Sequence, residues 1–445
     1  MMAQQQRGRP TYNLKVVVQE TGIKPDTLRA WERRYGLPRP SRTAGGHRLY
    51  TERDILTVKW LKARQAEGLS ISRAVNLWLQ FEEAGQDPLL EIPLFEAGPA
   101  TRTDLAAGAT MAGLRHAWLS ACLAFDEPSA EQALAQAFAL YPAETVCVDL
   151  IQRAMATIGD LWYEGQATVQ QEHFASALAL RKIDTLIAAA PAAIRPQHLL
   201  VGCPPGEEHS FPLLLITLLL RRHGWPVVYL GANVPRERLQ LTLDTVKPHL
   251  VILAAQQLYT AATLADTAEM LATAGIPLAF GGGLFHRMPA VSRRIAGHYL
   301  GSYISEIVGR VQQILTAWPA TPAVEPPPAR YQAARRHFQE RQPAIEALVW
   351  NQLSGQGIDP EHLDTANHYL AKDILAALKL GDMDFMTAEM AWLARLLVNY
   401  AISGDLLDQY LDSYRQAARS YLEDRAQPIL EWLDGVGPAL QILEK

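Results

Sequence analysis

The chain has 445 residues, of which 49% are apolar, and a formal net charge of −5. Its length predicts about three domains, and its composition is that of a globular protein with several buried cores. No apolar run reaches the roughly 18 residues of a membrane span, and the N-terminus lacks an apolar signal core. We therefore expect a cytoplasmic protein without membrane contact, whose three cysteines, without metal or redox spacing, are buried free thiols.

The charge is distributed unevenly along the chain. Residues 1–80 carry fifteen Lys and Arg against six Asp and Glu, whereas residues 326–445 carry eleven against seventeen. A basic N-terminal module on an acidic chain predicts a nucleic-acid contact confined to that module.

Residues 10–81 have the pattern of a winged helix-turn-helix. Leu14, Val17 and Val18 form an apolar helical stripe, and a turn at 21–23 precedes a second, Arg-rich helix that opens at Pro25. Residues 36–50 predict a wing hairpin, and helices over 52–66 and 70–81 complete the module.

The strings T-L-R-A-W-E-R-R-Y-G-L-P (27–38) and G-G-H-R-L-Y (45–50) resemble the MerR family of DNA-binding regulators. The resemblance implies double-stranded operator DNA as partner and a homo-oligomer, either a dimer or a tetramer. It places the DNA contacts on the second helix and on the wing, at Arg29, Arg33, Arg34, Tyr35, Arg42, His47 and Arg48.

A polar linker is predicted over 82–103, and a four-helix bundle over 104–194. The bundle segment is rich in Ala and Leu and has breaks near Asp126 and Tyr141. Its third break and fourth helix carry the spacing W-x9-E-H, formed by Trp162, Glu172 and His173.

Residues 195–318 alternate short apolar strands, expected at 199–203, 227–230, 250–255 and 277–280, with helices. This pattern predicts a flavodoxin-like, doubly wound parallel α/β sheet with its ligand at the carboxyl ends of the strands. His209 follows the first strand, and Gly281-Gly282-Gly283 follows the fourth, where glycine allows close approach of a ligand.

Together, W-x9-E-H and the Glu207-x-His209 loop resemble the cobalamin-binding module of light-responsive MerR-type regulators and, more distantly, of methionine synthase. The resemblance implies adenosylcobalamin as cofactor, with Trp162 over its upper face and His209 as the cobalt ligand from below. The residues expected to contact the cofactor are Trp162, Tyr163, Glu172, His173, Glu207, Glu208, His209, Gln256, Gly281, Gly282 and Gly283.

Three positions depart from this family pattern. Glu207-x-His209-x-x-Pro212 replaces Asp-x-His-x-x-Gly, and the usual Ser-x-Val/Leu falls on 254–256, where Gln256 or Gln257 is the available substitute. Tyr163 stands where related repressors carry a His that binds cobalt after photolysis. A phenol is a poorer neutral ligand, so that photoproduct would require His173 instead.

A Pro-rich linker over 319–329 precedes an aromatic-rich tail, 330–445, that is helical throughout. A winged helix, a cobalamin module and an all-α globin-like tail resemble photocobilins, which add a bilin such as biliverdin. No Cys follows Cys203, so the bilin would be non-covalent, with Arg395, Arg415 and Arg419 as candidates for its propionates. Heme, for which His337, His362 and His368 are the tail histidines, or oligomerisation alone are the alternatives.

The function expected from these features is a light-responsive transcriptional regulator, not an enzyme. The alternative is a cobalamin-binding component of a methyltransferase-type enzyme, but the chain shows no substrate barrel or acid–base pair.

Overall fold

The computed structural model describes residues 12–42, 48–66, 71–83, 88, 110–324, 326–354, 360–399 and 404–441. The chain divides into two units, Met1–Thr110 and Met111–Lys445. Within the described residues, none of the helices combines the length and apolarity that a bilayer span requires.

The first unit contains a helix-turn-helix and a short antiparallel hairpin. The second helix begins with Pro25 in its first turn and ends at Gly36, which adopts the left-handed conformation at φ 67°. The unit's core includes Leu28, Trp31 and Trp78. Its elements are α1 (Leu14–Thr21), α2 (Pro25–Tyr35), β1 (Ser41–Arg42), β2 (Arg48–Leu49), α3 (Glu52–Ala66) and α4 (Ile71–Glu83).

The second unit opens with a bundle of helices. Its last long helix starts with a capping box, in which Thr168 and Gln171 satisfy each other's backbone N–H groups. The expected breaks coincide with helix starts at Glu127 and Ala143. The elements are α5 (Met111–Leu123), α6 (Glu127–Leu140), α7 (Ala143–Thr145), the π-helix η2 (Val146–Gln152), α8 (Arg153–Tyr163) and α9 (Val169–Ala188).

A five-stranded parallel sheet follows, in the order β4-β3-β5-β6-β7. The strands are β3 (Leu199–Gly202), β4 (Val227–Tyr229), β5 (Leu250–Ala254), β6 (Leu278–Gly281) and β7 (His298–Tyr299). The connecting helices are α10 (Phe211–Arg222), α11 (Leu239–Val246), α12 (Leu258–Thr273), α13 (Gly283–Arg287), the 3-10 helix η3 (Pro289–Arg294) and α14 (Ile304–Ala317).

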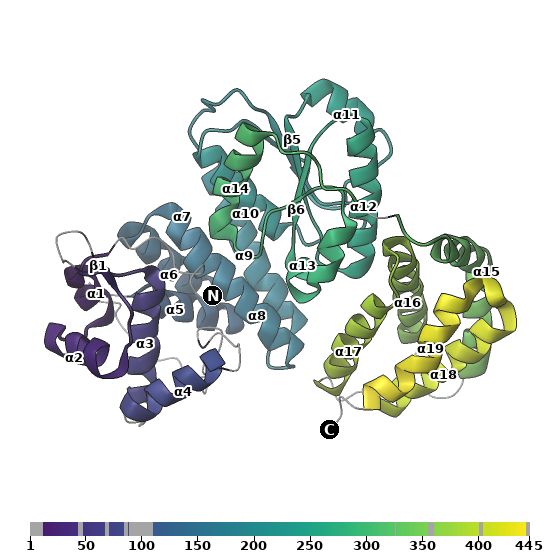
Figure 1. The fold of residues 1–445 in the computed structure, drawn as a ribbon, viewed down its shortest axis with the longest axis horizontal. Helices are drawn as coiled ribbons and strands as arrows, with labels where there is room; N and C mark the ends of the chain where they lie inside the picture. Colours follow the sequence, from purple (N-terminus) through teal and green to yellow (C-terminus); the bar gives the residue numbers. More distant parts are fainter. Residues whose placement is uncertain are drawn as a thin grey trace. The chain divides into compact units, whose positions relative to one another are not determined.

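Helices cover both faces of this sheet (Figure 1). Leu199, Val201 and Ile252 pack against α10 and α14, while Leu200 and Val251 pack against α11 and α12. The central strands β3 and β5 are buried along their whole length, as expected for parallel strands covered on both sides.

The C-terminal part is all helical, with α15 (Ala329–Leu353), α16 (Pro360–Leu380), α17 (Asp384–Asn399), α18 (Gly404–Tyr421), the 3-10 helix η4 (Asp424–Ala426) and α19 (Gln427–Gln441). These helices share a continuous apolar core with α12, against which α16 packs.

Most elements lie within a few residues of the expected ranges, with two differences that matter. The strand β7 was not expected, since two residues are too short for a periodic signal. The sequence pattern predicts the helix after the third strand from Ala261, but α12 begins at Leu258. This earlier start places Thr260 in the first turn of α12. The three cysteines are buried free thiols, as predicted.

Candidate functional site

The expected cofactor-binding residues of the sheet region follow the ends of β3, β5 and β6, at 207–209, 256 and 281–283. Neighbouring β3 and β5 send their connections to opposite faces of the sheet, and the carboxyl ends of such a strand pair are where open parallel α/β sheets bind ligands. The loop 203–210 after β3 presents His209, and its backbone is held by Asn233 Oδ1, which accepts a hydrogen bond from Gly206 N at 2.8 Å.

Glu207 is fully buried and orients His209. Its Oε1 lies 2.6 Å from His209 Nδ1 and also accepts the His209 backbone N–H at 3.0 Å. With Nδ1 donating to the carboxylate, Nε2 is the nitrogen that is available to a metal. The His209 side chain is 57% exposed, so the ring is accessible to solvent while its Nδ1 is held by Glu207.

The second oxygen of Glu207 is held by the start of α12. Oε2 accepts hydrogen bonds from Gln256 N and from Thr260 Oγ1, each at 2.7 Å. Burial alone would raise the pKa of Glu207, but these hydrogen bonds and those of His209 outweigh it and leave the pKa lowered. Glu207 is therefore an ionised acceptor at neutral pH.

The same contact acts on the imidazole in the opposite direction. The hydrogen bond with Glu207 raises the pKa of His209 by more than burial lowers it, and the negative charge of Glu172 adds to the increase. Glu172 belongs to α9 of the bundle, so this one residue of W-x9-E-H lies near enough for its charge to act on His209.

The remaining residues of W-x9-E-H lie at the end of α8 and the start of α9. Trp162 and Tyr163 are half-buried in the last turn of α8. Glu172 accepts a hydrogen bond from Ser176 Oγ at 2.6 Å, while the His173 side chain is 74% exposed. Glu208, next to the axial-ligand candidate, is exposed.

The glycine loop packs against the loop after β5. Gly282 has φ 122°, and a Cβ built there would lie 2.0 Å from Ala255 O. Gly283 N donates to Gln256 Oε1 at 2.7 Å. The neighbouring backbone therefore requires glycine at position 282. This packing explains the glycine without any ligand approaching the loop. Gln256 joins both loops, and Gln257 instead caps α12.

Two further residues at this edge of the sheet, Thr260 and Arg287, were not predicted from the sequence as part of the site. Thr260 donates a further hydrogen bond to Glu207. The only local sequence feature that marks Thr260 is its position three residues after Gln257, the N-cap of α12. Arg287 Nη2 donates to Gln256 O at 2.8 Å, and its positive charge partly opposes the increase that Glu207 causes in the pKa of His209.

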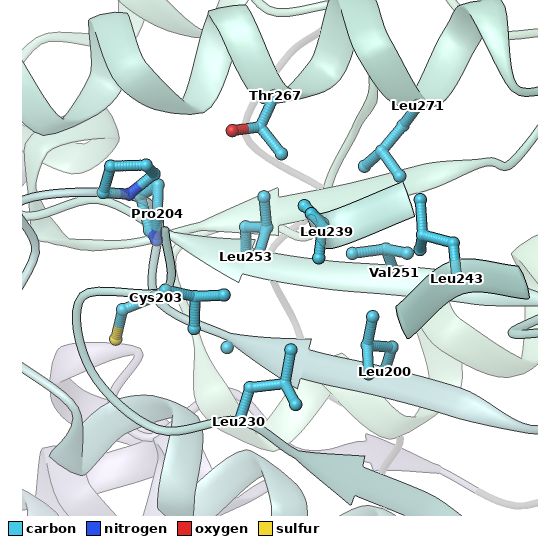
Figure 2. Close-up of a pocket in the computed structure, with 13 residues that line it drawn as sticks. Leu200, Cys203, Pro204, Leu230, Leu239, Leu243, Val251, Leu253, Thr267 and Leu271 are labelled. Carbon is cyan, nitrogen blue, oxygen red and sulfur yellow. The ribbon is translucent and has the colours of Figure 1, made fainter. Parts of the chain in front are cut away.

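A small cavity lies beside this edge, between the sheet and helices α11 and α12 (Figure 2). Its volume is about 20 Å³, and its walls are mostly Leu and Val side chains, including Leu200, Leu239 and Leu253. A space of that size holds about one water molecule, so it is a packing defect rather than a cofactor pocket.

In the first unit, the exposed face of α2 carries the expected DNA contacts. Arg29, Arg33 and Arg34 are exposed, and Arg29 pairs with Asp26 at 3.2 Å. The Arg34 guanidinium lies 5.4 Å from the ring centroid of Tyr35. Ion pairs between exposed groups are weak, so these arginines remain available to phosphates.

The wing residues differ from one another in their surroundings. Arg42 is exposed, whereas Arg48 Nε lies 2.7 Å from Glu32 Oε2 and joins the wing to α2. Tyr50 OH donates to the other oxygen of Glu32. His47 lies outside the described residues.

Family comparisons match each of these parts. The model of the MerR HTH family regulatory protein matches residues 12–78, and two B12 binding domain models match residues 114–187 and 197–300. The HTH-type transcriptional repressor CarH of Myxococcus xanthus is 33% identical over 291 residues, which cover 65% of this chain and 94% of CarH. The chain belongs to the MerR family of cobalamin-binding transcriptional regulators.

The chain is also similar to a second repressor and, in part, to a solved structure. The repressor CarA of Myxococcus xanthus is 31% identical over 248 residues, 55% of this chain and 76% of CarA. Among solved structures, the monomethylamine corrinoid protein of Methanosarcina barkeri is similar over 45% of this chain and 96% of its own, with 17% identity and a TM-score of 0.37. Because the named homologues are transcriptional repressors, the regulator is not an enzyme. The last of the three segments that these family models match ends at residue 300, so the C-terminal helices lie outside all three.

Proposed function

We propose that this regulator binds adenosylcobalamin, with His209 as the lower axial ligand, and changes its DNA binding on illumination. The observation that carries the proposal is the Glu207–His209 hydrogen bond, which fixes Nδ1 and turns Nε2 outward. A neutral imidazole oriented by a buried carboxylate fits the requirements of a cobalt ligand.

The bundle would provide the cover for the upper face. Trp162 and Tyr163 would lie against the adenosyl group, with Glu172 and His173 at the edge of the site. Bound adenosylcobalamin would supply a cobalt–carbon bond that light cleaves. The contacts of Trp162 would then differ before and after illumination, and such a difference is what shifts a conformational equilibrium.

The output would be a change in operator binding by a dimer or a tetramer. Arg29, Arg33 and Arg34 on α2 and Arg42 on the wing would contact the duplex, and phosphate contacts would supply most of the affinity. Arg48 and Tyr35 would assist from positions where they also contact neighbouring protein groups.

The test is a mobility-shift titration of operator DNA with adenosylcobalamin-loaded protein, kept dark or illuminated. We expect the apparent Kd to differ at least tenfold between the two conditions. Equal affinities, with a corrinoid spectrum that changes on illumination, would remove the light-gated output while leaving cobalamin binding intact.

For the C-terminal helices we propose non-covalent binding of a bilin such as biliverdin, within a globin-like arrangement. The supporting observation is a set of buried polar atoms without a hydrogen-bond partner among the described residues: Arg335 Nε, Tyr414 OH and Trp432 Nε1. Buried polar groups are normally paired, so a ligand with polar groups would satisfy them. Arg415 is tied to Asp412 and Leu433 O and Arg419 to Asp434, while the Arg395 side chain lies outside the described residues.

Expression with biliverdin tests this second proposal. The full chain should show a red absorption band that is absent from Tyr414→Phe or strongly shifted in it. A Soret band after growth with heme precursors would instead favour heme, and no band with either ligand would leave oligomerisation as the role of these helices.

A further inference from the structure

The loop after β3 packs against one face of α12. Thr263 Oγ1 donates a hydrogen bond to Pro205 O at 2.7 Å. One turn earlier on the same face, Tyr259 Oη donates to Gly206 O at 3.5 Å. The Tyr259 ring also limits the backbone of the loop, because a Cβ on Gly206, which has φ 83°, would lie 3.3 Å from the ring. Two side chains of α12 therefore hold the residues that precede Glu207.

The ring of Tyr259 also interacts with α16. The centroid of the Tyr369 ring lies 6.1 Å from that of Tyr259, with an interplanar angle of 49°. Lys372, about one turn further along α16, places its Nζ 4.9 Å from the centroid of Tyr259 and 5.5 Å from that of Tyr369. Aromatic pairs at this separation attract each other, and an ammonium group near an aromatic ring is attracted by the ring's quadrupole. Tyr259 therefore lies in contact with both the loop after β3 and α16.

Helices α12 and α16 are joined at a second place, two to three turns along α12 from Tyr259. Lys379 Nζ, on a side chain that is 14% exposed, lies 2.8 Å from Asp266 Oδ1 and 2.6 Å from Glu269 Oε1. These ion pairs attach α16 to α12 through residues other than Tyr259. They therefore allow the docking of α16 to be changed separately from its contact with the Tyr259 ring.

We propose that α16, through Tyr369 and Lys372, positions the loop after β3 by holding the ring of Tyr259. The helix limits the positions of this ring, and the ring limits the loop backbone directly before Glu207. Since Glu207 orients the His209 imidazole, the C-terminal helices would set the geometry of the lower cobalt ligand. The contacts form one continuous chain, as a physical account of coupling between two sites requires. The inference rests on the proposed cobalamin function.

The first measurement is amide deuterium exchange in the full chain without cobalamin. Tyr369→Ala and Lys372→Ala each remove a contact of α16 with the Tyr259 ring. Tyr369 is 46% exposed, so its replacement leaves the buried core intact. Each variant should speed exchange in segment 206–210 about two- to fivefold, the effect of losing one such contact. Thr263→Val, which removes the hydrogen bond to Pro205 O, is the positive control for a loosened loop.

A double-mutant cycle tests whether the effect passes through Tyr259. In Tyr259→Leu, which lacks the ring, Tyr369→Ala should not speed exchange at 206–210 any further. In Tyr259→Phe, which keeps the ring, Tyr369→Ala should retain its effect. An equal effect of Tyr369→Ala with and without the ring would overturn the proposal.

Lys379→Ala is the matched control for the docking of α16. It should speed exchange within α16 but leave segment 206–210 unchanged. Unchanged exchange at 206–210 in Tyr369→Ala, or an equal increase in Lys379→Ala, contradicts the role of the Tyr259 contact. If Tyr259→Leu does not fold, this comparison of Tyr369→Ala with Lys379→Ala decides the proposal by itself.

The second measurement is hydroxocobalamin binding followed by absorption. Tyr369→Ala should bind about two- to fivefold more weakly than wild type and show a smaller fraction of the imidazole-ligated spectrum, whereas Lys379→Ala should match wild type. Faster exchange with unchanged binding and spectrum in Tyr369→Ala would overturn the effect on the cobalt ligand. Wild-type protein that binds no hydroxocobalamin contradicts the proposed function instead, and exchange in the cobalamin-free protein still decides whether α16 positions the loop.

Discussion

Thr260 Oγ1 lies 2.7 Å from Glu207 Oε2, the carboxylate oxygen that does not contact the His209 ring. This contact joins α12, the helix that follows β5, to the loop after β3. The orientation of His209 therefore depends on the connections that follow two different strands. Each donor to Glu207 offsets part of the cost of burying its charge.

Glu207→Gln should weaken cobalamin binding about 10- to 100-fold, the usual cost of losing a group that orients a metal ligand. The amide keeps the size of the side chain but loses the charge that stabilises the orienting hydrogen bond. Hydroxocobalamin titration followed by absorption measures the effect. Glu340→Gln, an exposed position on α15, is the control, and similar losses in both variants would contradict the role of Glu207.

Thr260→Val should lower the free energy of unfolding by about 1–3 kcal/mol, because buried Glu207 loses a donor while the side-chain shape is retained. Thermal or urea unfolding without cobalamin measures it. Thr273→Val, in the last turn of the same helix, removes an exposed hydroxyl bonded to Glu269 O and should cost less than about 0.5 kcal/mol. Equal costs would mean that Thr260 does not support Glu207.

Gly282→Ala should destabilise the protein by about 3 kcal/mol or more, since its Cβ would overlap Ala255 O and its φ is 122°. Gly281→Ala is the control, because nothing lies within 4 Å of a Cβ there. Circular dichroism melting of both variants distinguishes them. A wild-type melting curve for Gly282→Ala would refute the close packing of the two loops.

Asp373 should make stability depend on pH. Burial first, and then the charge of Glu389, raise the pKa of Asp373 to about 8, against roughly 3.9 in an unfolded chain. The folded state therefore holds this proton more tightly, so the stability it contributes is complete below about pH 4 and is lost as pH rises through 8. Asp373→Asn should gain stability relative to wild type between pH 5 and 9, as measured by urea unfolding at each pH. A constant difference across that range would contradict the raised pKa.

Arg33→Ala should weaken binding to operator and unrelated duplex alike and reduce the slope of log K against log salt by about 1. Arg33 is chosen over Arg48 because Arg48 pairs with Glu32, so its removal would also disturb the wing. Arg341→Ala, an exposed position on α15, controls for the loss of one positive charge. An unchanged slope in Arg33→Ala would remove this residue from the DNA contact.

The sequence alone predicted the order and type of most elements of this chain. Pro25 and Gly36 mark the ends of α2, and the apolar runs at Leu199 and Leu250 mark buried parallel strands, because these signals are local and act within a few residues. The resemblance of W-x9-E-H and the Glu207-x-His209 loop to cobalamin-binding modules also implied His209 as the ligand candidate.

The tertiary structure decided which groups support that candidate. Thr260 and Arg287 are 51 and 78 residues from His209 in the sequence, and no local pattern connects them to it. Their roles depend on the parallel register that brings β3 beside β5 and β5 beside β6. Hydrogen bonds act over about 3 Å. Only the folded chain therefore determines which distant donors a buried carboxylate such as Glu207 receives.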